Sequence, residues 1–298
     1  MRAILDPPTT ATLNERESFT GRERVGLLIA TDGRPAADGA IIVGRSIAHR
    51  DGEPQELVAV EALERLSEQP GGTIIQHDLP LRLAQQRART TDVARDSWPL
   101  SIAYGSPDAT IAELADHTQR RLIVLGLHVH PRRDRWLARE TVLRVMQRAS
   151  CPVLAVDSNR RTIPRRTLLA IDFSPSSIAA AAEALRLVGD TGLVYFAHVI
   201  PRTAVPFDAG VQPIYEPDVR MRLALVERGL DIPPNVDTRI AVLRGDPAKE
   251  LLAFAEQEGM ELIATGSHGQ SALRGPVIGS VPTALVRAAR CSVLVMPT

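Results

Sequence analysis

The chain repeats its own landmarks at one fixed separation. Four groups of residues recur 140 positions later (172 − 32, 245 − 105, 266 − 126 and 291 − 151 all equal 140): Asp32 and Asp172, Gly105-Ser106-Pro107 and Gly245-Asp246-Pro247, Gly126-Leu127-His128 and Gly266-Ser267-His268, and Cys151-Pro152-Val153-Leu154 and Cys291-Ser292-Val293-Leu294. Landmarks that keep one separation with no net insertion indicate two copies of one domain. The copies can therefore be compared position by position, and a difference between them points to a difference in role.

Length and composition agree with two α/β domains. The 298 residues divide into two units of about 140 residues, an ordinary domain size. Apolar residues make up 44% of the chain and aromatic residues only 3%, so the cores are expected to consist of small and branched aliphatic side chains, as in buried parallel strands. The predicted organisation is a flexible tail over residues 1–20, a first domain over 21–157, a linker over 158–164 and a second domain over 165–298.

Charge and cysteine content argue against several classes of protein. The 35 basic and 35 acidic residues cancel, which gives no reason to expect binding to nucleic acid or to a membrane surface. No apolar run reaches the roughly 20 residues of a membrane-spanning helix, and the first residues lack the profile of a secretory signal. Two cysteines at equivalent positions, Cys151 and Cys291, indicate buried thiols in a cytoplasmic protein, with a disulfide between them as the alternative.

Apolar runs typical of strands alternate with helical stretches in both copies. In the second copy we expect strands at Thr167–Ile171, Leu193–Val199, Asp237–Leu243, Leu262–Thr265 and Val293–Met296, and helices at Ser176–Val188, Val219–Gly229, Ala248–Glu258 and Ser280–Ala289. In the first copy we expect strands at Val25–Ala30, Leu100–Tyr104, Leu122–Leu125 and Val153–Val156, and a helix at Glu140–Arg148. This alternation predicts two tandem doubly wound parallel-sheet domains with a Rossmann-like α/β fold. Ser174 is the expected N-cap of the first helix of the second copy, with Pro175 in its first turn.

The second copy carries a glycine-bracketed loop between a strand and a helix. Gly266 and Gly269 follow the strand Leu262–Thr265, and Gly279 and Ser280 stand directly before the last helix. Glycines let the backbone approach an anion closely, and the first N–H groups of a helix attract it. Ser280 can cap the helix or bond a phosphate oxygen. The layout predicts a phosphate site that matches neither the Walker A loop nor the dinucleotide fingerprint.

The loop spacing G-x2-G-x9-G-S over Gly266, Gly269, Gly279 and Ser280, followed by a helix and Val293-Leu294-Val295-Met296-Pro297, resembles the universal stress protein family. Its ATP-binding members carry G-x2-G-x9-G-[S/T] at this place, and the similarity covers nearly the whole chain as a tandem pair. The resemblance implies an adenine nucleotide at the carboxyl ends of the strands, with Asp172 near the ribose or a phosphate-bound metal ion and the Val199 backbone against the adenine. It also implies that the phosphates are held by the four loop residues and the Val281 amide. Thr265 and His268, in the same strand and turn, complete the candidate site.

The first copy departs from this pattern. Val129, Arg139 and Glu140 stand 140 residues before the second glycine, the third glycine and the serine of the loop. A valine side chain would obstruct the backbone approach, and a glutamate at the helix start would repel a phosphate. We therefore expect that the first half does not bind ATP in this way, that Glu140 itself takes the anion position, and that each chain binds one nucleotide.

The resulting prediction is a stress-response nucleotide-binding protein. Its C-terminal half takes ATP, with Mg²⁺ as a candidate companion ion, and its N-terminal half is structural. The same resemblance implies that the domains pair through Val153–Val156 and Val293–Met296 about a pseudo-two-fold axis, with a homodimer of chains as a further alternative. No nucleophile–base set is visible in the sequence, so at most slow ATP hydrolysis is expected. The alternatives are a nucleotide-free scaffold or chaperone-like module, a nucleotide hydrolase, and a preference for AMP or cyclic AMP; the protein partner is unknown.

Three residues of the second copy allow two interpretations each. Asp172 can organise the turn into the following helix as well as face a ligand. His198, at a strand end, is expected to pack as a polar residue rather than act as a base. His268, within the glycine-bracketed turn, is expected to contact either a phosphate or solvent.

Three further segments also allow two interpretations each. His128 and His130 share one face of an extended segment, but a metal site would need a third ligand and only Asp134 is near in sequence. The run Arg132–Arg135 is either a solvated loop or a grip for a phosphate or an acidic partner. The Pro-rich stretch Pro201–Pro217 is either a lid over the adenine pocket or an ordinary loop.

Overall fold

The computed structural model describes residues 24–61, 79–90, 100–127, 135–201, 216–269 and 278–298. The N-terminal half, up to residue 157, contains β1 (Leu27–Thr31), the short 3-10 helix η1 (Pro35–Ala37), α1 (Asp38–Asp51), β2 (Gln55–Glu61), α2 (Leu79–Thr90), β3 (Leu100–Tyr104), α3 (Pro107–His117), β4 (Leu122–Leu127), α4 (Arg135–Arg148) and β5 (Val153–Asp157). The C-terminal half, from residue 166, contains β6 (Arg166–Ala170), α5 (Pro175–Leu187), β7 (Gly192–Ile200), α6 (Glu216–Arg228), β8 (Val236–Arg244), α7 (Pro247–Gln257), β9 (Leu262–Gly266), α8 (Ser280–Ala288) and β10 (Ser292–Met296). The predicted tail, residues 1–20, lies outside the described residues.

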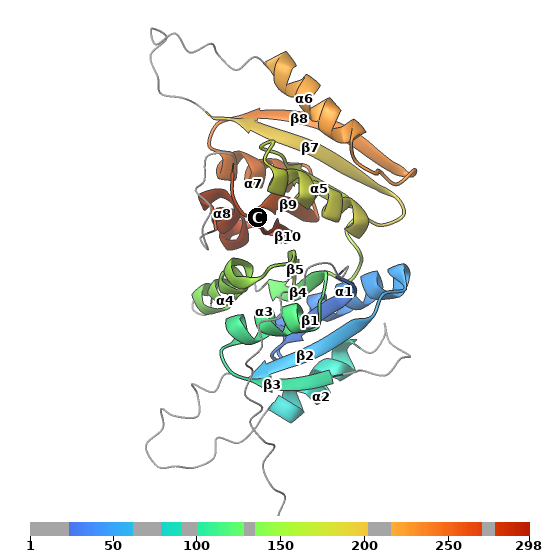
Figure 1. Ribbon diagram of the computed structural model, residues 1–298, viewed down its shortest axis with the longest axis vertical. Helices are drawn as coiled ribbons and strands as arrows, with labels where there is room; N and C mark the ends of the chain where they lie inside the picture. The colour runs from blue at the N-terminus through green and yellow to red at the C-terminus, as the bar shows by residue number, and fades with distance from the viewer. Residues whose placement is uncertain (1–23, 62–78, 91–99, 128–134, 202–215, 270–277) are drawn as a thin grey trace, which may run out of the picture.

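Within the described residues the strands form one ten-stranded sheet, in the order β3-β2-β1-β4-β5-β10-β9-β6-β7-β8 (Figure 1). The strand pairs inside each half are parallel, and β5 and β10 pair antiparallel where the halves meet. Leu154 is paired with Leu294, the residue 140 positions later (294 − 154), so a local two-fold axis passes through this pair. The predicted doubly wound fold and the predicted pairing of the last strands are therefore confirmed.

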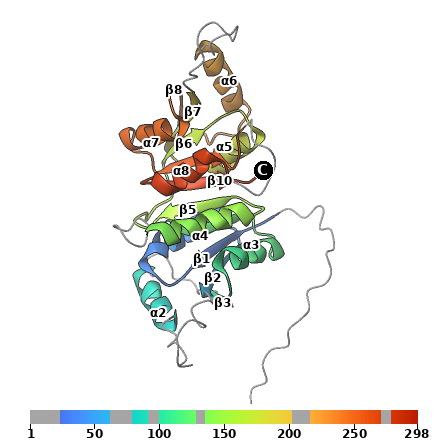
Figure 2. The ribbon, with the colours of Figure 1, turned by 90° about the vertical axis from the view of Figure 1, so that its left-hand side faces the viewer.

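Helices cover both faces of the sheet (Figure 2). Helices α1, α5 and α6 pack on one face, and α3, α4, α7 and α8 pack on the other. Each face has one hydrophobic cluster that includes both halves: Val145 and Leu285 share one cluster, and Ile41 and Leu185 share the other. Because burial of apolar surface is the main stabilising term in folding, the two halves stabilise each other through both cores.

The start of α5 follows the sequence prediction, whereas the start of α4 does not. Ser174 is the N-cap of α5, its Oγ accepts a hydrogen bond from the Ser177 N–H at 3.2 Å, and Pro175 is the first helical residue. Helix α4 begins at Arg135, five residues before the predicted start at Glu140 (140 − 135). The other predicted elements within the described residues were placed correctly in order, with ends that differ by up to three residues.

Both cysteines are free and buried, so the alternative of a disulfide between Cys151 and Cys291 is wrong. Burial raises the pKa of Cys151 to about 11 and that of Cys291 to about 12. Both thiols therefore stay protonated at neutral pH and behave as small apolar side chains. Among the helices that the structure describes, none combines the length and the apolar character needed to cross a membrane.

Candidate functional site

The candidate site lies where the order of the strands reverses. Strand β6 pairs with β7 on one side and with β9 on the other, and the helices that follow β6 and β9 lie on opposite faces of the sheet. The crevice between two such diverging loops is the usual ligand site of doubly wound sheets. The loops are joined directly, because the Ser176 hydroxyl donates to the carbonyl oxygen of His268 at 3.1 Å.

Asp172 directs one carboxylate oxygen at the turn and the other at the loop of Gly269. Oδ1 accepts hydrogen bonds from the Ser174 N–H at 2.9 Å and from the Ser174 hydroxyl at 2.5 Å, so this oxygen organises the turn into α5. Oδ2 faces the backbone of Gly269, where an added Cβ would lie 2.9 Å from it. The expected role in the turn is confirmed, and the second oxygen remains directed at the glycine of the other loop.

Gly266 is required by packing between a strand and a helix. A Cβ at this position would overlap the Ser176 hydroxyl and lie 2.9 Å from the Ser177 nitrogen at the start of α5. Gly126 meets the same restriction in the N-terminal half, where a Cβ would lie 2.9 Å from the Cα of Ala37. This close approach explains why Gly126 survives in the copy that has lost the other loop residues.

Helix α8 begins with N–H groups that have no acceptor inside the helix. Gly279 is its N-cap, and the Gly279 N–H donates to the Ser267 carbonyl oxygen at 2.8 Å, which ties the helix start to the end of β9. The next N–H groups, those of Ser280 and Val281, are among the first groups of the helix and lack intrahelical partners. The alternative in which Ser280 caps α8 is wrong, because Ser280 is the first helical residue.

The short turn after β9 holds a histidine with one unused ring nitrogen. His268 Nδ1 lies 3.0 Å from the Ser267 hydroxyl, and Nε2 is buried with no hydrogen-bond partner among the described residues. An orphaned buried polar atom in a native structure calls for a partner such as water or a ligand. Thr265 is different, because its buried hydroxyl donates to the Gly266 carbonyl oxygen at 3.2 Å and stays within the strand.

The end of β7 places His198 and Val199 on opposite faces of the sheet. His198 Nδ1 lies 2.7 Å from the carbonyl oxygen of Ile171, which confirms that this histidine packs as a polar residue. The Val199 side chain is buried in the cluster on the α7 and α8 face, and its backbone belongs to the ladder with β8. The Val199 side chain therefore points into the core, and the contact of its backbone with adenine stays a prediction of the resemblance.

Phe173, between Asp172 and Ser174, is a site residue that the sequence analysis missed. Its φ of +66° is left-handed, which costs a residue other than glycine roughly 1 kcal/mol. The ring centroid lies 4.9 Å from that of His198 and 3.8 Å from the guanidinium carbon of Arg222, a residue of α6. The available signal was Gly33, the equivalent residue of the first copy (173 − 33 = 140), which has a φ of +80°.

In the N-terminal half, α2 closes over the equivalent loop. A Cβ on Gly33 would lie 2.7 Å from the Cβ of Arg82, so the helix rests directly on the glycine, and the Arg82 guanidinium donates to the carbonyl oxygen of Asp32. Arg222 occupies the position equivalent to Arg82 (222 − 82 = 140) but lies on the Phe173 ring instead. Helix α2 packs against α1 as well as against Ala59 of β2 and Leu100 of β3, whereas the main contacts of α6 are with β7 and β8.

A buried polar network fixes α2 in this closed position. Gln86 is completely buried, accepts a hydrogen bond from the Thr31 hydroxyl at 2.7 Å and donates to Asp38 Oδ1 at 3.0 Å. Arg89 donates from Nε to the other oxygen of Asp38 at 2.6 Å. In the C-terminal half the equivalent positions carry no such side chains: Ile171, Ile178, Val226 and Gly229.

The carboxylate of Asp32 is also engaged differently from that of Asp172. Oδ1 accepts from the Arg34 N–H at 3.0 Å, and the Arg34 Nε lies 3.6 Å from Oδ2. In the C-terminal half the residue equivalent to Arg34 is Ser174, which bonds only Oδ1 of its aspartate. The N-terminal half therefore supplies its own cation at the place where Asp172 has an oxygen directed at Gly269.

Glu140 does not occupy an anion position at a helix start, so that expectation is wrong. It is the sixth residue of α4 (Arg135–Arg148), and its Oε1 lies 2.6 Å from the guanidinium of Arg287 in α8. The glutamate connects the two halves of the molecule. Helix α4 extends further toward its N-terminus than the equivalent helix α8 does.

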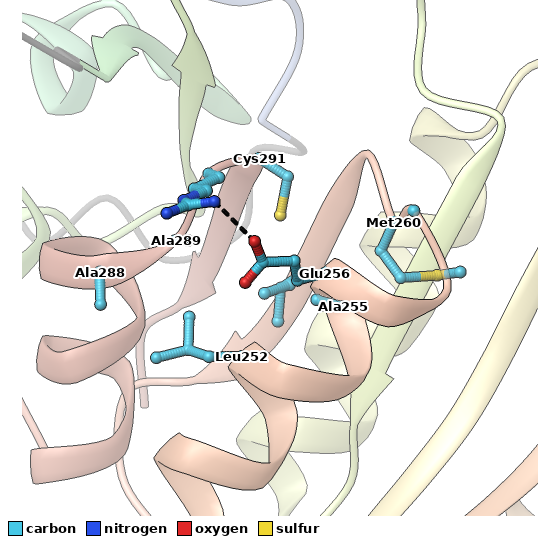
Figure 3. Close-up of a pocket in the computed structure, with 10 residues that line it drawn as sticks. Leu252, Ala255, Glu256, Met260, Ala288, Ala289 and Cys291 are labelled. Atoms are coloured by element: carbon cyan, nitrogen blue, oxygen red, sulfur yellow. Dashed lines mark hydrogen bonds and ion pairs between the residues drawn. The ribbon is translucent and has the colours of Figure 1, made fainter.

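A separate apolar pocket of about 240 Å³ lies beside the ends of α7 and α8, next to the starts of β9 and β10 (Figure 3). Its walls are mainly aliphatic and sulfur-containing side chains: Leu252, Ala255, Met260, Ile263, Ala289 and Cys291. An ion pair of 2.6 Å between Glu256 and Arg290 bridges its rim. The pocket is at the other end of the strands from Asp172 and Gly266 and contains none of the predicted site residues.

Some predictions fall outside the described residues. These are the histidine pair His128 and His130 with Asp134, the position Val129, most of the run Arg132–Arg135, and most of the stretch Pro201–Pro217. In the part of the chain that the structure describes, no group of three or more histidine, cysteine, aspartate or glutamate residues is arranged to hold a metal ion.

Comparison with known proteins identifies the class of fold. The model of the universal stress protein family matches residues 26–157 and again residues 164–297. The chain therefore belongs to the universal stress protein family, as a member with two tandem domains.

The relatives agree with this assignment. Universal stress protein Mb2028c of Mycobacterium bovis and universal stress protein Rv2005c of Mycobacterium tuberculosis are each 30% identical over 206 residues, which cover 65% of this chain and 67% of the relative. A universal stress protein structure from Archaeoglobus fulgidus has a TM-score of 0.63 at 18% identity, covering 91% of this chain and 98% of that one, which shows the shared fold. A universal stress protein solved in complex with cAMP covers 45% of this chain at 19% identity, with a TM-score of 0.34.

Proposed function

We propose that the C-terminal half binds an adenine nucleotide, with ATP and Mg²⁺ as the leading pair, and that the N-terminal half does not. The observation that carries the proposal is the approach of Asp172 Oδ2 to the Gly269 backbone, in a space that a single Cβ would enter. This approach lies at the strand-order reversal, where doubly wound sheets bind nucleotides. The bound nucleotide would bias a surface of the protein for a partner in the stress response.

The groups around this space suit a phosphate and a cation together. The N–H groups of Ser280 and Val281 open α8, the Ser280 hydroxyl is not used as a cap, and His268 Nε2 has no partner among the described residues. The N–H and O–H groups match phosphate oxygens as donors, and His268 Nε2 does so in the tautomer that carries its proton there. Asp172 would repel a phosphate, so a hard cation such as Mg²⁺ between them gives each anion an opposite charge.

The N-terminal half lacks these features for reasons that do not depend on the glycine motif. Helix α2 rests on Gly33, and Arg34 lies against the Asp32 carboxylate. A nucleotide would have to displace both the helix and the buried Gln86 network. We therefore infer one nucleotide per chain, with the N-terminal half serving as the structural partner of the binding half.

The two cysteines and the site residues indicate the setting in which this function is expected. Two buried free thiols, Cys151 and Cys291, suit a reducing cytoplasm. No catalytic role is proposed for Asp172 or His268. Hydrolysis would need only a positioned water beside the bound phosphates and metal ion, and it would be measurable as slow turnover.

The test is the ligand that the protein retains. Mass spectrometry of material released from gently purified chain is expected to detect an adenine nucleotide, and isothermal titration of nucleotide-free protein with ATP and Mg²⁺ is expected to give one site per chain. Gly269→Val should remove both signals. Gly189→Val is the matched control, because a Cβ there meets nothing closer than 3.7 Å.

Three outcomes would contradict the proposal. Two equal sites per chain would contradict the closed N-terminal half, and an unaltered affinity in Gly269→Val would contradict the assigned loop. Absence of binding to ATP, AMP and cyclic AMP alike would favour the scaffold or chaperone-like alternative. Stronger binding of AMP or cyclic AMP than of ATP would keep the site and change the ligand.

A further inference from the structure

The contact between the halves contains charged pairs that the local two-fold axis does not repeat. On one face, Arg121 before β4 reaches Glu183 of α5 with an N–O distance of 2.5 Å, and the two side chains are only 8% and 10% exposed. On the other face, Glu140 of α4 pairs with Arg287 of α8 at 2.6 Å. An interface between identical halves would show each pair twice.

The residues at the equivalent positions explain why the pairs are single. Glu261 is equivalent to Arg121 (261 − 121 = 140), and Val43 is equivalent to Glu183 (183 − 43 = 140). Glu261 turns instead to the linker, where its carboxylate lies 2.6 Å from the Arg160 guanidinium and accepts from the Arg165 N–H at 2.6 Å. The positions of Arg121 and Glu183 therefore form an ion pair on one side of the axis. On the other side the equivalent positions hold Glu261 and Val43, which cannot form one.

Glu183 depends strongly on its partner from the other half. Burial raises the pKa of this carboxyl above its ordinary value, although the Arg121 guanidinium beside it acts in the opposite direction. Arg121 has additional partners in its own half, because its Nε lies 2.6 Å from Glu53 and its other guanidinium nitrogen 3.4 Å from Asp51. Arg186 of the same helix also acts on Glu183 through its charge, but the hydrogen bond to this carboxylate comes from Arg121. Loss of the contact would thus leave the buried carboxylate without that donor, which is the costly outcome for a buried ion pair.

Pairing between like halves of two chains would break these contacts. If two C-terminal halves met through β10, Glu183 would face Glu261, and two carboxylates would repel each other in a shielded place. If two N-terminal halves met through β5, Arg121 would face Val43. At the Glu140–Arg287 positions, like halves would set Glu140 against Gln147, or Ser280 against Arg287, with no opposite charges in either case.

We propose that the Arg121–Glu183 and Glu140–Arg287 pairs make the central surface of each half specific for the other kind of half. The surface of the N-terminal half recognises a carboxylate near its own buried arginine and a guanidinium near its own glutamate. Strand β5 consequently pairs with β10, and neither strand pairs with its own copy in a second chain. Any association between chains then uses a different surface.

A single cysteine on the axis can report like-with-like pairing. The test uses the full chain with Cys151→Ala and Cys291→Ala, and with Leu294→Cys as the reporter. Because Leu294 pairs with the equivalent Leu154, a thiol at this position would meet its own copy when two C-terminal halves pair through β10. Copper–phenanthroline oxidation followed by a non-reducing gel measures the fraction of covalent dimer.

We expect little covalent dimer with native Glu183 and a several-fold increase when Glu183→Arg is added. The new charge would repel Arg121 in the native pairing and attract Glu261 in the like pairing. Glu183→Gln should give an intermediate increase, and it decides the question if the arginine variant does not fold. Ala182→Arg is the control for the introduced arginine, because the exposed neighbouring residue gains a guanidinium without facing Arg121.

The Glu140–Arg287 pair allows a charge-exchange experiment, in which a second substitution reverses the effect of the first. Arg287→Glu should raise the dimer fraction, and Glu140→Arg added to it should lower the fraction again, because the exchanged charges restore the contact. The proposal is overturned if both Glu183 variants leave the dimer fraction unchanged while circular dichroism shows folded chains. It is equally overturned if the chain with native Glu183 already forms as much dimer as the variants.

Discussion

The two halves of this chain use the same loop in opposite ways. After β1, Gly33 lets α2 rest on the backbone, and Arg34 lies against the Asp32 carboxylate. After β6, the Phe173 ring lies between the loop and Arg222 of α6, and one oxygen of Asp172 faces Gly269. The smaller residue lets a helix rest directly on the loop, whereas the ring of the larger one is covered by an arginine of the equivalent helix. A single side chain in this turn therefore changes what the next helix contacts.

The largest effect is expected from adding a side chain at Gly33, where α2 rests on the loop. Gly33→Val should lower the free energy of unfolding by about 3 kcal/mol, because it combines a left-handed φ with overpacking against Arg82. Gly52→Val is the matched control: its φ of +64° is similar, but nothing lies within 4 Å of an added Cβ. Urea denaturation compares the two. Equal losses would show that α2 does not rest on the glycine.

The next effect comes from the network that anchors α2. Gln86→Val, which copies Val226 of the other half, should cost about 2 kcal/mol of unfolding free energy, because the Thr31 hydroxyl and Asp38 each lose a buried hydrogen bond. Gln85→Val changes the same residue type on the exposed side of the helix and should cost less than about 0.5 kcal/mol. Similar losses of stability in both variants would show that the Gln86 network does not hold α2 in place.

The third prediction tests Phe173 as a positioning residue for the proposed site. Phe173→Gly should weaken nucleotide binding about tenfold, or about 1.4 kcal/mol, because α6 can then approach the loop as α2 does. Phe173→Leu keeps bulk at this position and should retain most of the affinity. Titration calorimetry measures both variants. A glycine variant that binds as tightly as the native chain would contradict the spacing role of the ring.

The smallest effect concerns Glu261, which carries the opposite charge to its equivalent Arg121. Burial alone would raise the pKa of Glu261, but the Arg165 N–H and the Arg160 guanidinium outweigh burial and hold the pKa below its ordinary value of 4.5. A carboxyl with a depressed folded-state pKa adds stability above its unfolded pKa and loses it as the pH falls through the folded value. Glu261→Gln should therefore cost about 1 kcal/mol at neutral pH and nothing once the native carboxyl is protonated.

Urea denaturation of both chains at neutral pH and well below pH 4.5 tests this sign. The native chain should lose its advantage over Glu261→Gln only in the acidic range. An advantage that persists after protonation would mean that shape, rather than charge, holds the linker to the C-terminal half.

The repeat made most of the architecture predictable from the sequence. Landmarks 140 residues apart predicted two doubly wound domains, and the Ser174-Pro175 signal located the start of α5 because a cap acts through neighbouring residues alone. The start of α4 was misplaced because the position of Glu140 was taken from the sister helix, whereas α4 extends five residues further.

The candidate site was less predictable, because its features depend on distant parts of the chain. Phe173 adopts a left-handed φ that its own residue type disfavours, and the contact with Arg222 joins residues 49 positions apart (222 − 173). The closure by Gln86 requires α2, β1 and α1 to be placed first. Gly266 belongs to the nucleotide-binding motif. Its close packing against Ser176 depends on how β9 and α5 pack together, and the motif alone does not predict it.

The hydrophobic clusters that run through both halves have a consequence for behaviour at low abundance. A dimer of separate single-domain chains comes apart when its concentration falls below its dissociation constant. Here the eight residues between β5 and β6 (158–165) hold the second half beside the first at a fixed effective concentration, however dilute the protein becomes. The N-terminal half, in which α2 rests on Gly33, thereby stays packed against the C-terminal half even when only a few copies of the protein are present.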